Sequence, residues 1–406
     1  MSLLSKQINN HIEQNYVAFH SPAHAGKLNP RDLSELDGLD DLQAPKEVLK
    51  DCQEQVAEIF GAKQSWFLVN GASVGMQAAC LALKIYLNSI NDQRPVLVAR
   101  NVHKSVIAGI ILAGLEVEWF EPEWNAELGI FTVIARIQGH QNLAGYGDDR
   151  EPRPVTKQSN ASAIIITNPT YEGFHTDLLS LRGAAGDVAI PIIVDEAHGA
   201  HYQFTSQLPA TALEQGADIA VQSWHKTLGS LGQTGVLHQS KSSKIPSQYI
   251  ADSLKLLQTT SPSYLLLESI TEVAELYSKE GQGIVEETIR ISKNIQLPSY
   301  PNSDPYRLII PGPGRKIEEL LAEQKILIEA AYENFALLFI NPGNDQADIT
   351  RLNSCAAAIE ELCKNYQAKK ISKPKALEVS SPREAFLNGQ TSIEAPCPPG
   401  IIIHED

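Results

Sequence analysis

The sequence predicts an α/β protein with a doubly wound, mostly parallel sheet and a second, smaller C-terminal α/β domain. Short apolar runs alternate with stretches of helical spacing from about residue 45 onward, which is typical of βαβ units. Polar residues follow directly after several of these runs, where the carboxyl ends of parallel strands bind ligands. The 406 residues are enough for two or three domains.

The first two regions are an N-terminal arm, 1–44, and a large domain, 45–260. The arm has a short helical start and then Pro, Gly and Asp residues that break periodicity, so it is expected to pack on the rest. The large domain is predicted to contain helices and seven short strands. The helices are 46–60, 74–86 and 105–113, and the strands are 65–69, 96–99, 117–120, 163–167, 190–194, 219–222 and 235–238.

The third region is the small C-terminal domain, 261–406. It is predicted to begin with a long helix at 264–291 and to continue with a strand at 308–311 and a helix at 317–332. The stretch 136–161 in the large domain is polar and aperiodic, which predicts a surface loop or a disordered insertion.

Composition argues against several classes of protein. The net charge is −15 and Lys and Arg are not clustered, which argues against nucleic-acid binding. No apolar stretch approaches the roughly 20 residues that span a bilayer, and the first residues lack a signal-peptide pattern, so a cytoplasmic protein without a membrane partner is expected. The cysteines show no CxxC spacing and are predicted to be reduced thiols: Cys52, Cys80, Cys355, Cys363 and Cys397.

The most informative residues are Asp195 and Lys226, which lie 31 positions apart. Asp195 ends an apolar run, and a carboxylate there is costly to bury without a cation. Lys226 follows Ser223-Trp224-His225, where loss of water and nearby positive groups would make its amine nucleophilic. Pyridoxal phosphate needs both groups, a carboxylate for its pyridinium nitrogen and a lysine for a Schiff base. A lysine after a strand is otherwise a solvated surface residue.

Three further segments follow apolar runs, and each has a simpler alternative. The turn 70–75, Asn-Gly-Ala-Ser-Val-Gly, could bind phosphate through free N–H groups and the Ser73 hydroxyl, or could be a plain helix cap. His103 could stack on a flat cofactor ring, or could be an exposed residue of a capping segment. The segment 167–171 is favoured, on its own, as a turn with no further role.

His198 and His201 raise the alternative of a metal site together with Asp195. The two histidines are three positions apart at a strand end, and no further ligand accompanies them. This spacing is not that of a known zinc site, so no metal is expected.

On these residues the chain resembles the Orn/Lys/Arg decarboxylase family, bacterial pyridoxal-phosphate enzymes of the aspartate-aminotransferase fold. The resemblance covers most of the chain, and the Asp-Glu-Ala-His-Gly-Ala-His and His-Lys-Thr-Leu blocks are its most specific parts. The blocks that carry it are 20–26, 38–42, 70–75, 100–105, 168–171, 195–201, 223–228, 258–264, 381–386 and 397–400.

The resemblance implies a role for each candidate residue. Lys226 would form the Schiff base, Asp195 would pair with the ring nitrogen, and His103 would stack on the ring. His198 would lie beside the cofactor, and Lys226 or His225 would protonate Cα of the product. The phosphate would be held by Ala72, Ser73, Ser223 and His225, and by Thr260 and Ser261 of a neighbouring subunit. A homodimer would then be the minimal active unit.

The expected activity is decarboxylation of a basic amino acid, with arginine favoured over lysine or ornithine and with polyamine synthesis as the natural pathway. The carboxylate that would bind the distal cation of the substrate is in no recognisable motif. Two alternatives stay open. The first is an aminotransferase or lyase on the same fold, for which Arg307 is a candidate clamp of the substrate carboxylate. The second is a non-catalytic regulatory relative.

Departures from the family pattern bear on these alternatives. Ala23 and Ala25 stand in the arm where glycine and a basic residue are expected, and Ala72 stands where serine is usual. The phosphate would lose one hydroxyl donor at residue 72, and backbone N–H groups could partly replace it. The family's C-terminal tail is shortened, which could alter substrate access without abolishing cofactor binding.

Overall fold

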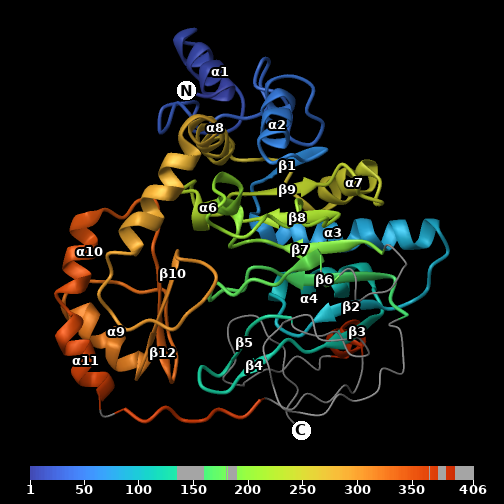
Figure 1. The fold of residues 1–406 in the computed structure, drawn as a ribbon. Coiled ribbons are helices and arrows are strands. Elements are labelled where there is room, and N and C mark those ends of the chain that lie inside the picture. The colour runs from blue at the N-terminus through green and yellow to red at the C-terminus, as the bar shows by residue number, and fades with distance from the viewer. Residues whose placement is uncertain (135–159, 180, 182–189, 365, 374–380, 389–406) are drawn as a thin grey trace.

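The computed structural model describes residues 1–134, 160–179, 181, 190–364, 366–373 and 381–388 (Figure 1). Most of the predicted insertion 136–161, the 397–400 block and Cys397 lie outside these residues.

The centre of the described structure is a seven-stranded sheet in the order β1-β9-β8-β7-β6-β2-β3 (Figure 1). Strand β9 is antiparallel to both of its neighbours, and the other neighbouring pairs are parallel. The predicted doubly wound, mostly parallel sheet is confirmed. The strands are β1 (Gln64–Leu68), β2 (Val96–Ala99), β3 (Val117–Phe120), β6 (Ala163–Thr167), β7 (Ile192–Asp195), β8 (Ile219–Gln222) and β9 (Gly235–Gln239).

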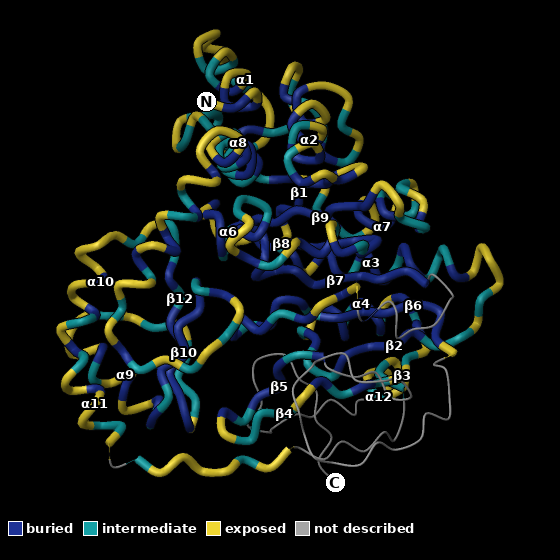
Figure 2. Tube along the Cα trace, in the orientation of Figure 1, coloured by how far each residue is buried: buried dark blue, intermediate teal, exposed yellow. Residues whose placement is uncertain are grey.

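Helices cover both faces of this sheet, and the residues of β1 show how. Successive side chains of a strand point to opposite faces. Trp66 and Leu68 therefore join the core beneath α3 (Gly71–Ser89), α4 (Lys104–Ala113) and α7 (Ser247–Leu257). Phe67 and Val69 join a second core, built with α1 (Leu3–Glu13), α2 (Val48–Ile59) and α8 (Tyr264–Ser292). Figure 2 shows the sheet as the most continuously buried part of the chain.

A second, antiparallel sheet in the order β10-β12-β11 forms the smaller α/β part. Its strands are β10 (Arg307–Pro311), β11 (Ala330–Ala331) and β12 (Phe335–Phe339), and its helices are α9 (Gly314–Glu323), α10 (Gln346–Asn353) and α11 (Ala356–Lys364). The helix predicted at 317–332 is wrong beyond Glu323. Lys325 has a φ of 57°, a left-handed conformation that ends the helix. Ile326 and Ile328 then pack two positions apart, with the spacing of a strand.

A short hairpin connects the two sheets and was not predicted. It consists of β4 (Trp124–Asn125) and β5 (Ile130–Phe131), and Leu128 and Ile130 pack against Ile309 of β10. The segment 366–373, called here the return segment, comes back to this hairpin from α11. Trp124 Nε1 donates to the Ile371 carbonyl at 3.0 Å. Asn334 Nδ2 donates to the carbonyls of Glu127 and Lys369, which joins β12, the hairpin and the return segment.

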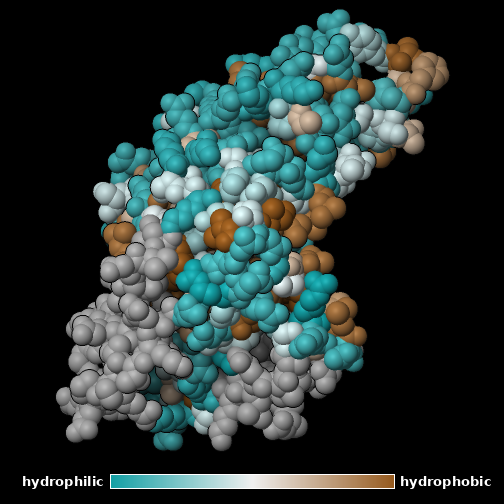
Figure 3. Space-filling view, turned by 90° about the vertical axis from the view of Figure 1, so that its right-hand side faces the viewer, coloured by the Kyte–Doolittle hydropathy of each residue, from teal (hydrophilic) through white to brown (hydrophobic). Residues whose placement is uncertain are grey.

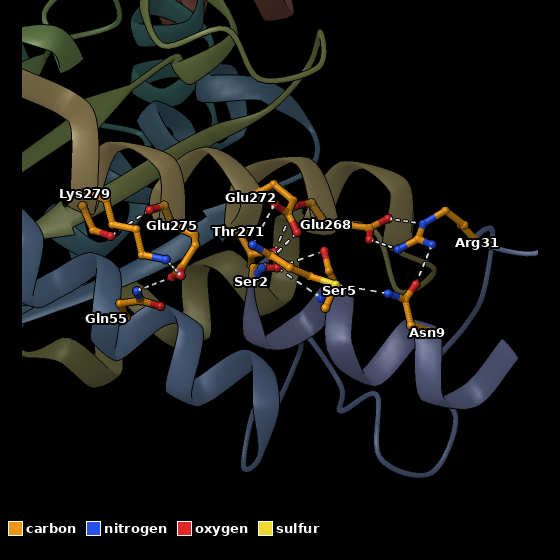
Figure 4. Close-up of polar contacts among 12 residues, drawn as sticks. Ser2, Ser5, Asn9, Arg31, Gln55, Glu268, Thr271, Glu272, Glu275 and Lys279 are labelled. Carbon is orange, nitrogen blue, oxygen red and sulfur yellow. Dashed lines mark hydrogen bonds and ion pairs between the residues drawn. The ribbon is translucent and has the colours of Figure 1, made fainter. Parts of the chain in front are cut away.

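The N-terminal arm is held against α8 by polar contacts (Figure 4). The Arg31 guanidinium forms a two-point ion pair with Glu268 and donates to Asn9 Oδ1 at 2.8 Å. The Ser2 amide donates to Glu272 Oε1 at 2.9 Å. These contacts tie the start of α1 and the loop after it to one face of α8, while Leu4 and Ile8 of α1 are fully buried beneath them.

Two of the blocks that carry the family resemblance stabilise helix ends. The Asp40 carboxylate accepts hydrogen bonds from Lys46, Glu47 and Leu49 N–H at 2.8–3.1 Å, so it satisfies donors at the start of α2. Arg383 of α12 (Pro382–Leu387) donates to the Ile111 carbonyl at the end of α4.

None of the described helices is long and apolar enough to cross a membrane. The face in Figure 3 is mostly hydrophilic, with hydrophobic residues in small separate groups. The four described cysteines are unpaired thiols.

Candidate functional site

A cavity of about 330 Å³ lies where several parallel strands of the large sheet end. Thr167 and Asp195 are the last residues of β6 and β7, and Ser223 follows β8 directly. Because these strands are neighbours, their carboxyl ends meet at one edge, as expected for an α/β sheet. Eight of the ten predicted site residues line the cavity: Ala72, Ser73, His103, Asp195, His198, Ser223, His225 and Lys226.

The first turn of α3 forms one end of this cavity. Gly71, Ala72 and Ser73 line it, and the first N–H groups of a helix have no acceptor within the helix. Asn70, at the N-cap position, does not cap α3, because its Oδ1 accepts the Thr259 N–H at 3.0 Å. Gly235 lets β9 lie close to both β8 and this turn, since a Cβ there would be 2.6 Å from the Gln222 carbonyl and 3.3 Å from the Ala72 nitrogen. The Gly71 N–H donates to the Gln233 carbonyl at 2.8 Å, so the N–H groups of Ala72 and Ser73 and the helix-end field are what this turn offers a phosphate.

Asp195 supplies a buried carboxylate on the cavity wall. Only 4% of the residue is exposed, and its Oδ1 accepts the Ala197 N–H at 3.2 Å. Burial raises the pKa of this carboxyl group, although the charge of Lys226 and the Ala197 hydrogen bond oppose the rise. Among the described residues, no cation forms an ion pair with it within 4 Å. A ligand with a protonated ring nitrogen would provide the partner that this carboxylate lacks.

Lys226 lies in the four-residue helix α6 (Trp224–Thr227), directly after β8. Burial lowers the pKa of its amine, Asp195 opposes this shift, and Arg307 adds to it. Its Nζ lies 3.1 Å from His198 Nε2, and Arg307 Nη2 lies 3.0 Å from His198 Nδ1. Burial, Lys226 and Arg307 together hold the pKa of His198 well below its usual range. Desolvation therefore outweighs the nearby carboxylates in lowering the pKa of Lys226, and a desolvated lysine is a nucleophilic amine.

His103 and His225 have defined proton positions. His103 Nδ1 accepts the Ser105 N–H at 3.2 Å, so the ring proton is on Nε2. Burial, Lys226 and Lys104 lower the pKa of His103 to about 4. His225 Nδ1 donates to the Thr234 carbonyl at 2.8 Å, which leaves the lone pair on Nε2. Burial also lowers the pKa of His225. Both rings are neutral at pH 7.

A buried hydrogen-bond network lies behind the Lys226 turn and centres on Gln222. Its Oε1 accepts from Trp224 Nε1 at 3.0 Å and from His238 Nε2 at 3.1 Å, and its Nε2 donates to Glu196 at 2.8 Å. The Ser65 hydroxyl donates to His238 Nδ1 at 2.8 Å, which places the His238 proton on Nε2. Each donor named in this network therefore has an acceptor. The network fixes the end of β8, from which Ser223 and Lys226 extend.

The cavity also has polar atoms without partners. Asn101 Oδ1 and Thr167 Oγ1 are buried and make no hydrogen bond within the described structure, and both residues line the cavity. These atoms, the buried Asp195 carboxylate, the free first turn of α3 and the desolvated Lys226 amine form a donor and acceptor set that fits pyridoxal phosphate.

Several residues lie away from their expected roles. Arg307, the candidate clamp, does not line the cavity, because its guanidinium stacks on Phe339 at 3.8 Å and faces His198. His201 lies outside the cavity and is 3.1 Å from Asp304. Thr260 and Ser261 are exposed and do not line it either, so their contact with a neighbouring subunit stays a prediction.

Sequence reasoning missed Glu172 as a cavity residue. It follows the third predicted segment, and 3% of it is exposed. No motif marks it, although a carboxylate directly after a strand-end turn is a signal that could have been noted.

Three comparisons relate the chain to known proteins. Residues 24–299 match the family model for the major domain of Orn/Lys/Arg decarboxylase. Arginine decarboxylase of Bacillus subtilis (strain 168) is 30% identical, over 97% of this chain and 86% of that protein. Lysine decarboxylase LdcA of Pseudomonas aeruginosa is 24% identical, over 68% of this chain and 40% of that protein.

The constitutive lysine decarboxylase structure from E. coli matches with a TM-score of 0.70 and 18% identity. The match covers 89% of this chain and 61% of that one, so the chain spans less than two thirds of that structure. This similarity concerns the fold.

Proposed function

We propose, from the premise that the chain belongs to the Orn/Lys/Arg decarboxylase family, that it decarboxylates arginine with Lys226 as the reactive amine. The family and the relatives make it a pyridoxal-phosphate-dependent decarboxylase of basic amino acids. The observation that carries the assignment of residues is the cavity itself. There, a desolvated lysine, a buried carboxylate and the free first turn of a helix line one space.

Each cavity residue has a part in holding the cofactor. The N–H groups of Ala72 and Ser73, with the Ser73 and Ser223 hydroxyl groups, bind the phosphate. Asp195 pairs with the ring nitrogen and keeps it protonated, and the neutral His103 ring stacks on the cofactor ring. When bound, the cofactor takes up the electron pair that remains at Cα after CO₂ leaves. Exclusion of water by the buried walls favours this step, because charge spreads over more atoms as CO₂ leaves.

The proton that replaces CO₂ comes from Lys226 or from His225. His225 is neutral and its Nδ1–H is held by the Thr234 carbonyl, so Nε2 must first collect a proton. Lys226, a free amine beside His198, must collect a proton too, but an alkylamine has the higher proton affinity of the two groups and collects it more readily. We therefore assign the proton donation to Lys226 and a supporting role at the phosphate to His225.

The extent of the sequence matches favours arginine over lysine as the substrate. The match with the arginine decarboxylase covers most of both chains, whereas the match with the lysine decarboxylase covers less than half of that protein. Polyamine synthesis, a cytoplasmic location, and a homodimer in which Thr260 and Ser261 reach the partner's phosphate are parts of the same proposal.

The position of Arg307 argues against an aminotransferase. An aminotransferase holds the substrate carboxylate with an arginine, but Arg307 lies behind His198 and outside the cavity wall. A decarboxylase has to leave that carboxylate free to depart. The alternative of a non-catalytic relative is disfavoured because Asp195, His225 and Lys226 are all present in the cavity.

The test is a visible absorption spectrum of the purified protein with pyridoxal phosphate, before and after separate additions of arginine, lysine and ornithine. The amine product is assayed in the same samples. We expect a band from the lysine-bound cofactor that Lys226→Ala abolishes, and amine from arginine above all. A band without any amine would contradict the decarboxylase, and the absence of a band would contradict the assignment of the cofactor site.

A further inference from the structure

Glu172 is a second buried carboxylate on the wall of the cavity that contains Lys226. It follows Tyr171 in the turn after β6, and 3% of it is exposed. The Thr170 hydroxyl donates to its carboxylate. Among the described residues, no cation lies within ion-pair distance of it. A carboxylate that is removed from water and has no cationic partner is costly for a fold to keep.

The described groups that face Glu172 form no ion pair with it. Arg307, on β10, is close enough to favour the ionised carboxylate, but its two Nη groups donate to the Tyr306 carbonyl and His198, and its ring neighbour is Phe339. Within the described structure its Nε has no hydrogen-bond partner and forms no ion pair with Glu172 within 4 Å. Tyr171 and Tyr332 add hydroxyl groups and no positive charge. Burial, the largest effect, raises the pKa of Glu172 to about 7. The carboxylate therefore has hydrogen-bond donors, from Thr170 and its own backbone, but no ion-pair partner among the described residues, and a cationic ligand would supply one.

We propose that Glu172 binds the distal cation of the basic amino acid in this cavity. This inference rests on the proposed function. It assigns one buried carboxylate, Asp195, to the ring nitrogen and the other, Glu172, to the side chain of the substrate. A guanidinium group binds a carboxylate through two parallel hydrogen bonds, which gives both attraction and orientation. An uncharged side chain of the same shape would leave Glu172 without a partner.

Glu329 is the rival carboxylate, and its surroundings differ. Its charge also influences Lys226, so it lies in the same neighbourhood. However, Glu329 is exposed, does not line the cavity, and already accepts the Tyr171 hydroxyl. An exposed, partnered carboxylate is screened by water and discriminates weakly between ligands. Glu329→Gln is therefore a matched control for Glu172→Gln, because both remove one carboxylate near the site and keep the side-chain shape.

The experiment compares wild type, Glu172→Gln and Glu329→Gln as holoenzymes with two ligand pairs. The first pair is arginine and citrulline, which differ in a charged guanidinium and a neutral urea group, and kcat/KM is measured. The second pair is agmatine, the amine product from arginine, and its urea analogue, and Kd is measured by calorimetry. The absorption band of the bound cofactor shows that each variant keeps its site.

We expect Glu172→Gln to weaken the preference for the guanidinium ligand over its urea analogue by roughly 10²-fold, in both kcat/KM and Kd. Glu329→Gln should keep the preference of the wild type. Retention of the preference in Glu172→Gln, its loss in Glu329→Gln, or a wild type that binds both amines equally would overturn the inference. The binding measurement needs no turnover, so a failure of the proposed activity is seen separately as an absence of amine from arginine.

Discussion

The guanidinium of Arg307 donates a hydrogen bond to Nδ1 of His198 at 3.0 Å. Because a guanidinium can only donate, Nδ1 must accept, and the proton of the neutral imidazole lies on Nε2. That Nε2 is 3.1 Å from Lys226 Nζ, so the lysine must accept as a free amine. The arrangement therefore selects the nucleophilic form of Lys226, in agreement with the lowered pKa of its amine.

Arg307→Met should slow the capture of pyridoxal phosphate by the apoprotein. Without the guanidinium, His198 can place its proton on either nitrogen, and the pKa of Lys226 rises toward its usual value, so less free amine is present. We expect the rate at which the cofactor band forms at pH 7 to fall by roughly an order of magnitude and to recover at higher pH. Arg290→Met, which removes a charge from an exposed ion pair on α8, is the control. Equal rates in the two variants would contradict the argument.

Glu172→Gln should stabilise the ligand-free protein, and more so as the pH rises. The pKa of Glu172 in the fold, about 7, lies above its ordinary value, so the stability that it contributes is present below about pH 4.5 and is lost as the pH rises through 7. Glutamine keeps the uncharged form throughout. The gain should be close to zero at pH 4.5 and about 3 kcal/mol at pH 8, measured by urea unfolding. If the free energy of unfolding changed with pH in the same way in the variant and the wild type, the raised pKa of Glu172 would be contradicted.

Asp40→Asn should cost stability, whereas Asp41→Asn should not. Both oxygens of Asp40 accept backbone N–H groups at the start of α2, and an amide would present its NH₂ to donors on one side. Asp41 Oδ1 accepts only the Gln43 N–H among the described contacts, and an asparagine oxygen can replace it. We expect a loss of about 1–3 kcal/mol for Asp40→Asn and less than about 0.5 kcal/mol for Asp41→Asn. Chemical unfolding of the two neighbouring variants gives the comparison directly.

Gln222→Leu should destabilise the protein and lower the activity together. The substitution leaves Trp224 Nε1, His238 Nε2 and Glu196 Oε2 without their partner in a buried setting, while Glu196 Oε1 keeps the Ala212 N–H. We expect a loss of about 3 kcal/mol or more, together with a lower kcat, because the end of β8 positions Lys226. Gln248→Leu, at an exposed position of α7, should stay within about 0.5 kcal/mol of the wild type. A fully active Gln222→Leu would show that the network does not position the lysine.

The large sheet was predictable because its strands are short apolar runs that are buried on both faces, such as Val96–Ala99 and Ile219–Gln222. The hairpin β4–β5 was not, since its two-residue strands carry no periodicity and depend on packing against Ile309. The helix expected to reach Tyr332 shows the same limit. Its apolar residues continue in sequence, but the left-handed backbone at Lys325 redirects them into the second sheet.

The residues of the candidate site that lie at strand ends or in motifs could be predicted from the sequence. Asp195 and Lys226 follow strands that are neighbours in the sheet, so their meeting in one cavity follows from the order of the strands. The position of Glu172 depends on how the turn after β6 folds back into the cavity, and the sequence pattern does not indicate the conformation of that turn. The contact of Arg307 with His198 joins a residue of β10 to one in the loop after β7, 109 positions away, and only tertiary packing brings the two together.

The return segment 366–373 gives the second sheet a second attachment to the rest of the molecule. The chain enters this part through α8 and leaves it along the return segment, which is bonded to the hairpin at Trp124. This part is therefore a body held against the large sheet by two chain connections and by the packing of Ile309 on the hairpin, which together restrain its rotation. Arg307 and Phe339 belong to that body, so any such rotation moves the guanidinium relative to His198 and changes the proton position that keeps Lys226 reactive.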